Sequence, residues 1–234
     1  MDPHTAPNDF PSTRWSRILL PAGRRDLDAL IHAYERPIRT YLAACQGRGG
    51  DLDDLAQDAF AWLLTSGLLD KADPQRGRFR GFLKRSLRNF VSERHRRAQA
   101  QKRGGSLTVQ PVADADEPVD GRERAPDAAL DDAWRRELLQ TAQARLRDEL
   151  LAKGHEIRWR VFADYFLTSG DEPDHATLAA RHGITRTDVA NWLDRARQRY
   201  RALLHAAVAE TVADPEALRD ELDWLFGRDG GGRG

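Results

Sequence analysis

The sequence predicts an all-α protein: two small helical domains joined by a flexible acidic linker, the second containing a helix-turn-helix. Three observations lead to this prediction. Of the 234 residues, 40% are hydrophobic and 32% are charged, and the helix formers Ala, Leu and Arg dominate. Apolar residues recur at helical spacing along most of the chain. That periodicity vanishes between residues 104 and 129, where Gly, Pro, Ala and acidic residues predict a linker.

The first domain is expected over residues 12–103. Residues 1–11 are expected to be disordered and to lead into a short capped helix. An amphipathic helix should follow from about Arg24 to Cys45, and Pro37 should kink or split it. Cys45 is the one cysteine of the chain, which excludes an internal disulfide and favours a reducing compartment.

An acidic helix is predicted from Asp51 to about Ser66. Its apolar residues fall on one face: Leu52, Leu55, Ala59 and Leu63. Asp54, Gln57, Asp58 and Ala61 fall largely on another. The four Asp residues between 51 and 58 do not form a calcium loop, because the required glycine and terminal Glu are missing. The charged face is therefore either simply solvated or a surface for a protein partner.

A basic helix is predicted from Phe79 to about Gln101. From Lys71 to Arg103 the chain has twelve Lys or Arg residues against two acids, a net charge of +10, which is typical of a surface for a polyanion. Phe82 and Phe90 fall on the apolar stripe of this helix and are expected in the core. Phe79 precedes the stripe and is the better candidate for an exposed ring that stacks on a base. The preceding loop, residues 67–77, is either a connector or a pocket for an extruded base.

The second domain is expected over residues 130–226. After two helices, a short helix, a turn at Gly183 and a longer helix to about Ala209 form a helix-turn-helix pattern, with Thr185 and Asp188 as a capping box. Away from its core stripe the longer helix carries side chains suited to base edges and phosphates: Arg186, Asn191, Arg195 and Arg199. A last helix, capped by Asp214 and with Pro215 at its first position, is expected to dock on this domain or to meet a regulator.

Four motifs in the first domain carry a family resemblance. They are D-L-x-x-L-x-Q-D-x-F from Asp51, D-P-x-R-G-R-F-R-x-F-L from Asp73, L-x-N-F from Leu87 and K-R-G-G from Lys102. Their order resembles the second conserved region of extracytoplasmic-function (ECF) sigma factors, the promoter-recognition subunits of bacterial RNA polymerase. The helix-turn-helix resembles the fourth region of the same family. Together the two resemblances cover about residues 13–103 and 130–209.

The resemblance implies three sets of contact residues. The acidic helix would bind the clamp helices of core polymerase through Asp54, Leu55, Gln57, Asp58 and Phe60. The basic segment would open and read the minus-ten element through Arg78, Phe79, Arg80, Lys84, Arg85, Arg88 and Asn89. The second domain would read the minus-thirty-five element through Arg186, Thr187, Asn191, Arg195 and Arg199. Ala190 and Trp192 depart from the family pattern and leave the base preference open; Trp192 either packs on the scaffold or lies against a sugar or a thymine methyl.

The predicted function is sigma-type transcription initiation, with core RNA polymerase and promoter DNA as partners. An anti-sigma factor or another regulator is an open further partner, and the net charge of −6 between Ala113 and Asp132 suggests that the linker shields the basic surfaces while polymerase is absent. A stand-alone repressor or activator is the alternative, because the helix-turn-helix also fits it. The sequence has no nucleophile–base pair, phosphate-binding glycine loop or metal-ligand pattern, so no enzyme activity, catalytic residue, cofactor or metal is predicted. A cytoplasmic protein without a membrane partner is expected, since no apolar run reaches membrane-spanning length.

Overall fold

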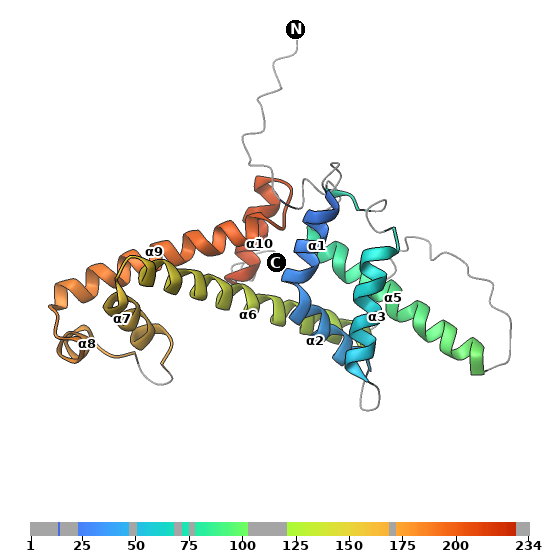
Figure 1. Ribbon diagram of the computed structural model, residues 1–234, viewed down its shortest axis with the longest axis horizontal. Coiled ribbons are helices and arrows are strands. Elements are labelled where there is room, and N and C mark those ends of the chain that lie inside the picture. Colours follow the sequence, from blue (N-terminus) through green and yellow to red (C-terminus); the bar gives the residue numbers. More distant parts are fainter. Residues whose placement is uncertain are drawn as a thin grey trace, which may run out of the picture. The chain divides into compact units, whose positions relative to one another are not determined.

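The computed structural model describes residues 14, 23–46, 51–67, 72–74, 78–102, 121–168 and 172–227. These residues form helices and no strand, which confirms the all-α prediction (Figure 1). The predicted lead-in, the short helix after residue 12, most of the loop 67–77 and the first part of the linker lie outside the described residues. The chain divides into two units, one from Met1–Glu137 with Ala209–Gly234 and one from Leu138–Val208.

The first unit begins with two helices, α1 (Gly23–Ala33) and α2 (Glu35–Gln46). The sequence predicted one helix that Pro37 kinks or splits, and the structure shows the split at Tyr34. Proline lacks an N–H group and its ring clashes with the carbonyl four residues earlier, so it fits best in the first turn of a new helix. Pro37 occupies that first turn in α2.

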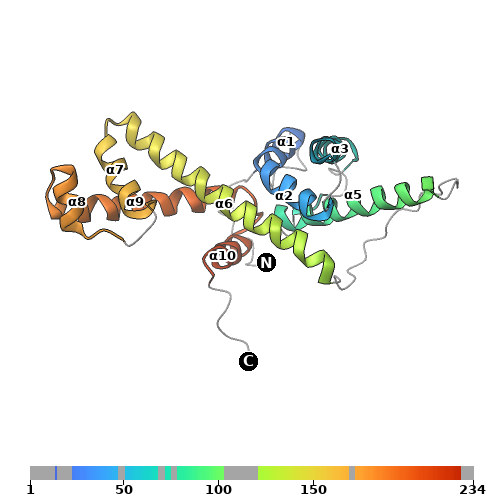
Figure 2. The same cartoon turned by 90° about the horizontal axis from the view of Figure 1, so that it is seen from below.

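Helices α3 (Leu52–Thr65) and α5 (Phe79–Lys102) are the predicted acidic and basic helices of this unit. Both lie within a residue or two of their predicted bounds. Helix α3 packs between α2 and α5, and the neighbouring helices lie side by side in both views (Figures 1 and 2). The core between them is formed by fully buried side chains, including Ile38, Leu42, Leu63, Leu83 and Leu87.

Two further segments join the first unit, and both correct the sequence prediction. Helix α6 (Gly121–Ala152) begins inside the segment predicted as a linker, so residues 121–129 are helical. Helix α10 (Pro215–Leu225) was expected to dock on the second domain or to meet a regulator. The structure contradicts the first alternative, because α10 packs against α5 and the first half of α6. The physical reason is the same for both. Their acidic residues find cationic partners on α5, which sequence periodicity does not reveal.

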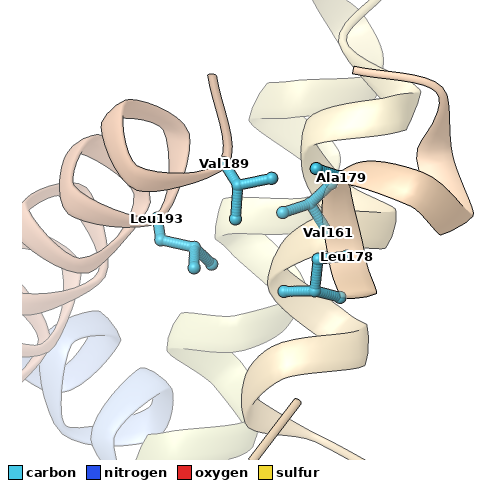
Figure 3. Close-up of a cluster of buried hydrophobic side chains, with 5 residues drawn as sticks. All are labelled: Val161, Leu178, Ala179, Val189 and Leu193. Carbon is cyan, nitrogen blue, oxygen red and sulfur yellow. The ribbon is translucent and has the colours of Figure 1, made fainter. Parts of the chain in front are cut away.

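The second unit contains the remainder of α6 with α7 (Glu156–Phe166), α8 (His175–His182) and most of α9 (Arg186–Ala209). Apolar side chains from α7, α8 and α9 converge in one cluster: Val161, Leu178, Ala179, Val189 and Leu193 (Figure 3). All five are buried, and Tyr165, Ile184 and Trp192 pack against them. This cluster fixes α8 and the first turns of α9 relative to α7.

Candidate nucleic-acid interface

Helix α3 has a rigid, acidic first turn. The side chain of Asp51 caps it by accepting hydrogen bonds from the backbone N–H groups of Asp53 (2.9 Å) and Asp54 (3.3 Å). The cap stabilises the helix because N–H groups at a helix start have no partner within the helix. Two of the acids on α3 also form ion pairs with neighbouring helices: Asp53 with Arg39 of α2, and Asp58 with Arg94 of α5.

The five residues implied in polymerase binding do not share one surface. Asp54, Gln57 and Asp58 are exposed, and among the described residues the side chains of Asp54 and Gln57 have no partner. Phe60 is half-buried. Leu55 is only 5% exposed and belongs to the core. Leu55 therefore positions the helix, whereas the polar residues form its accessible face.

Arg80, one of the predicted minus-ten contacts, is buried among acids and aromatic rings. It is 7% exposed, and it donates hydrogen bonds from Nε and Nη2 to the two carboxylate oxygens of Glu221, both at 2.9 Å. Its Nη1 donates to Asp131. The guanidinium lies over the rings of Trp224 (3.8 Å to the centroid) and Trp134 (5.1 Å). All the groups that could bind DNA through this side chain are thus engaged within the protein.

The charge of Arg80 is maintained by these partners. Burial acts to lower the pKa of Arg80, but the hydrogen bonds and negative charge of Glu221, and then of Asp131, outweigh it and leave the pKa above its ordinary value. A buried cation requires such partners because removing a charge from water costs several kcal/mol. Glu221 is itself 0% exposed, so each ion depends on the other.

Three other predicted minus-ten cations are also paired with acids outside α5. Arg78 donates to Glu221 (2.6 Å) and Asp220 (3.1 Å), Lys84 to Asp131 (2.6 Å), and Arg88 to Asp127 (3.3 Å). Asn89 is half-buried. Among the predicted minus-ten residues in the described part of the chain, Arg85 alone is an exposed cation without an ion pair.

The prediction that Phe79 is an exposed stacking ring is wrong. Phe79 is 0% exposed, and its ring meets that of Tyr34 edge-on, with the centroids 5.1 Å apart. Its backbone N–H donates to the carbonyl of Thr211 at 3.0 Å, a residue beyond the end of α9. Phe79 is buried because Tyr34, between α1 and α2, and the segment leading to α10 cover the start of α5.

Sequence reasoning missed the residues that engage the basic helix. These are Asp127, Asp131, Trp134, Asp220, Glu221 and Trp224. Charge complementarity was the available signal, because residues 113–132 carry a net charge of −6 and residues 207–226 a net charge of −5, against +10 on residues 71–103. The sequence indicated shielding by the linker, but not the particular pairs or the contribution of α10.

In the second unit, α8 and α9 flank a tight turn. Gly183 has φ 65°, a left-handed conformation that glycine adopts without strain, and it ends α8. The predicted capping box is present. The Asp188 N–H donates to Thr185 Oγ1 (3.0 Å), and the Thr185 N–H donates back to the Asp188 carboxylate (3.2 Å). Two of the orphan N–H groups at the start of α9 are thereby satisfied.

The start of α9 exposes the residues predicted to read DNA. Arg186, Thr187, Asn191 and Arg195 are exposed and lie on one helix. Arg199 is also exposed, but its Nε and Nη2 donate to the Glu149 carboxylate at 2.7 and 2.5 Å. The first four side chains are thus available to a ligand, whereas Arg199 has a partner on α6.

Trp192 packs on the scaffold, which was one of its two predicted positions. Its half-buried ring lies against the cluster of Figure 3, and the guanidinium of Arg158 lies over it, 5.2 Å from the centroid. One face of the indole is therefore already covered by a cation. In this arrangement Trp192 supports the first turns of α9 against α7.

The described residues contain no cluster of three or more His, Cys, Asp or Glu side chains that could hold a metal ion. None of the helices that the structure describes is long and apolar enough to cross a membrane.

Comparison with known proteins identifies one domain. Residues 30–101 match the family model described as Sigma-70 region 2, which spans the end of α1, all of α2 and α3 and nearly all of α5. The match supports a sigma-70 family factor with a role in transcription initiation. Sigma-70 region 2 domains bind core RNA polymerase and promoter DNA, and the sigma family is not a family of enzymes. No curated protein and no solved structure gave a match.

Proposed function

We propose that the chain is a sigma factor of the extracytoplasmic-function type. It binds core RNA polymerase in the cytoplasm, recognises minus-ten and minus-thirty-five elements and starts transcription. The observation that carries this proposal is the region 2 match over residues 30–101, which contains both the acidic helix α3 and the basic helix α5. A repressor would need neither an acidic helix nor an aromatic, basic segment beside its DNA-reading helix.

The polymerase surface would be the polar face of α3. Asp54 and Gln57 are exposed, and the described residues hold no partner for their side chains. The Asp51 cap keeps the first turn rigid, so these groups need little ordering on binding. Asp54 is therefore the residue on which core binding would depend most directly.

The minus-thirty-five surface would be the start of α9. Arginine and asparagine side chains pair with guanine and adenine edges, and Arg186 and Asn191 are both exposed there. A single such helix provides a small interface, so the free protein should bind DNA weakly and with strong salt dependence. Core polymerase would join this contact to the region 2 contact and create one bivalent engagement.

A pull-down with core polymerase tests the proposal. Asp54→Arg should abolish retention of the chain, whereas Asp148→Arg, which reverses an exposed charge on α6, should not. Asp58 is avoided because it pairs with Arg94. Circular dichroism of both variants should remain that of the parent, since surface charges contribute little to stability. Equal retention of a folded Asp54→Arg variant would remove α3 from the interface.

Transcription and DNA binding separate the two classes of function. The parent chain with core polymerase should direct transcription from selected genomic fragments, and the chain alone should give no tight complex with them. Nanomolar, sequence-specific binding by a dimer of the chain alone, at about physiological salt, would favour the repressor and overturn the sigma proposal.

A further inference from the structure

We propose that four acids of this chain compete with promoter DNA for four cations between residues 78 and 88, at the start of α5 and just before it. These acids, named here the acidic cover, are Asp127, Asp131, Asp220 and Glu221. The cations they occupy, the covered cations, are Arg78, Arg80, Lys84 and Arg88. The proposal rests on the proposed function, which supplies the role of these cations as minus-ten contacts.

The acidic cover engages the cations in the way a nucleic-acid backbone does. Arginine presents a planar fork of N–H donors that fits two oxygens of a carboxylate or of a phosphate. Glu221 fills the fork of Arg80 with two hydrogen bonds of 2.9 Å and also accepts one from Arg78 at 2.6 Å. DNA phosphates can reach the same N–H groups only when the carboxylates leave them.

The cover comes from outside the matched domain. Asp127 and Asp131 lie on the first turns of α6, and Asp220 and Glu221 lie on α10, whereas the family match ends at residue 101. The charges of the segments nearly balance: −6 for residues 113–132 and −5 for residues 207–226, against +10 for residues 71–103. The matched domain therefore folds here with its basic surface neutralised by two added segments.

The cover is strong at its centre and weak at its edge. Arg80 and Glu221 are both buried, and Trp134 and Trp224 flank the guanidinium, so this pair should persist when DNA binds. At the edge, the Asp220 side chain is 59% exposed and its pair with Arg78 is screened by water.

The pair of Asp127 with Arg88 forms another weak edge. It consists of one contact of 3.3 Å, and in the described structure Asp127 Oδ1 and Arg88 Nε are buried without a hydrogen-bond partner. Such unsatisfied atoms weaken the pair, because each retains its desolvation cost. We therefore expect DNA to displace the edge of the cover and to leave Arg80 as its anchor.

Salt dependence distinguishes covered from uncovered cations. A cation that binds DNA from solution releases a counterion, and each such contact adds about 0.7 to the slope of log K against log salt on single strands. A covered cation is paired with a carboxylate of the chain instead of a counterion. When it binds DNA it therefore releases no counterion and adds little to the slope. Releasing the cover should therefore make binding both tighter and more salt-sensitive.

The test is fluorescence anisotropy of the full chain with labelled oligo(dT) across a salt series. Asp127→Asn/Asp131→Asn frees Arg88 and Lys84 while Glu221 still holds Arg80. We expect the slope to steepen by about 1.4 and the affinity at about 0.1 M salt to rise about 25-fold, with convergence toward 1 M. The matched control is Asp132→Asn/Asp148→Asn, which makes the same change of net charge at two exposed positions of α6 that do not pair with α5.

Helix α10 provides a second, milder pair of variants. Asp220→Asn removes an edge carboxylate beside Arg78, and Glu216→Gln removes an exposed charge from the same helix that has no partner among the described residues. Both sites are at the surface, so both variants should fold. Tighter binding is expected for Asp220→Asn alone.

A double-mutant cycle tests the competition at one pair. Arg88→Ala should change DNA affinity little in the parent, where Asp127 occupies Arg88, and should lower it about fivefold at about 0.1 M salt in the Asp127→Asn background. Arg85→Ala is the matched control. Arg85 is exposed without an ion pair, so its replacement should weaken binding equally in both backgrounds.

The outcomes separate this proposal from the proposed function. Cover variants with the affinity and slope of the parent, no measurable binding by any variant, or equal gains in the charge-matched controls would each overturn the cover. Failure of the parent to bind core polymerase would overturn the sigma function alone. Steeper, tighter binding by the cover variants supports the competition in either case.

Discussion

The guanidinium of Arg80 lies 3.8 Å from the centroid of the Trp224 ring, although these residues are far apart in the sequence. The contact joins α5 to α10 in the interior of the first unit. A cation over an indole face is stabilised by the ring quadrupole, and more so where water is excluded. The same ring lies 5.7 Å from that of Trp134 and also carries the guanidinium of Arg135 at 4.5 Å.

Trp224→Ala should therefore destabilise the first unit. The change removes an aromatic wall from Arg80 and leaves a cavity beside Trp134, which should lower the free energy of unfolding by about 2–4 kcal/mol. Urea denaturation followed by circular dichroism measures this. Phe226→Ala, at an exposed neighbour, should cost about 1 kcal/mol or less. Equal losses for the two variants would contradict the role of the Arg80 contact.

Phe79→Ala should chiefly destabilise the first unit, and any effect on DNA binding should follow from that loss of stability. The ring is fully buried against Tyr34, so its removal should lower the free energy of unfolding by about 3–5 kcal/mol. Phe82→Ala, at a half-buried position of the same helix, should cost less. An unchanged denaturation midpoint for Phe79→Ala would instead indicate the exposed stacking ring that the sequence suggested.

Arg186→Ala and Asn191→Ala should weaken the holoenzyme at the upstream promoter element. A lost base-edge contact costs about 1–3 kcal/mol, whereas core association and unfolding should not change because both side chains are exposed. Competition electrophoresis with altered upstream sequences measures the loss. Arg199→Ala should have a smaller effect, since Glu149 already binds that guanidinium. A larger loss for Arg199→Ala than for Arg186→Ala and Asn191→Ala would place the base contact farther along α9.

Asp164 should make the second unit sensitive to acid. The hydrogen bond from Arg181, and a weaker one from His182, lower the pKa of Asp164 below its ordinary value of 3.8, although burial opposes them. A lowered pKa means that the ionised carboxylate stabilises the fold above pH 3.8, and that this contribution is lost as pH falls through the lower folded value. The contribution should be below about 1 kcal/mol, because Arg181 is half exposed.

Unfolding of Asp164→Asn and parent at two pH values measures that contribution. The variant should be less stable than the parent at about pH 7, and the difference should shrink at about pH 2.5. Asp148→Asn, which removes an exposed carboxylate of α6, should match the parent at both. A constant difference for Asp164→Asn would show that its effect does not depend on ionisation.

Features set by near neighbours in the sequence were predictable. The caps at Asp214 and Thr185 were expected and are present, because each partner lies within three residues. The environments of Phe79 and Arg80 were not predictable. Arg80 and Glu221 are 141 residues apart, and the local spacing of apolar residues gives no information about a pair so distant in the sequence.

Separation in the sequence also explains why residues 121–129 were wrongly predicted to be linker. The Gly, Pro, Ala and acidic residues of the segment 104–129 favour an extended chain when the segment is considered alone. In the structure Asp127 and Asp131 pair with Arg88 and Lys84 of α5. These pairs hold the segment as the start of α6, which local composition does not predict.

The division of the first unit has a consequence for biosynthesis. Its two portions, Met1–Glu137 and Ala209–Gly234, are separated in the sequence by Leu138–Val208. A ribosome releases Arg80 long before it polymerises Glu221, so while the intervening unit emerges Arg80 has Asp131 available as a partner but not Glu221. That unit is contiguous and its contacts are more local, so we expect it to fold first and to shorten the loop that the closing helix must span. The basic surface is therefore completed only after α10 has been synthesised.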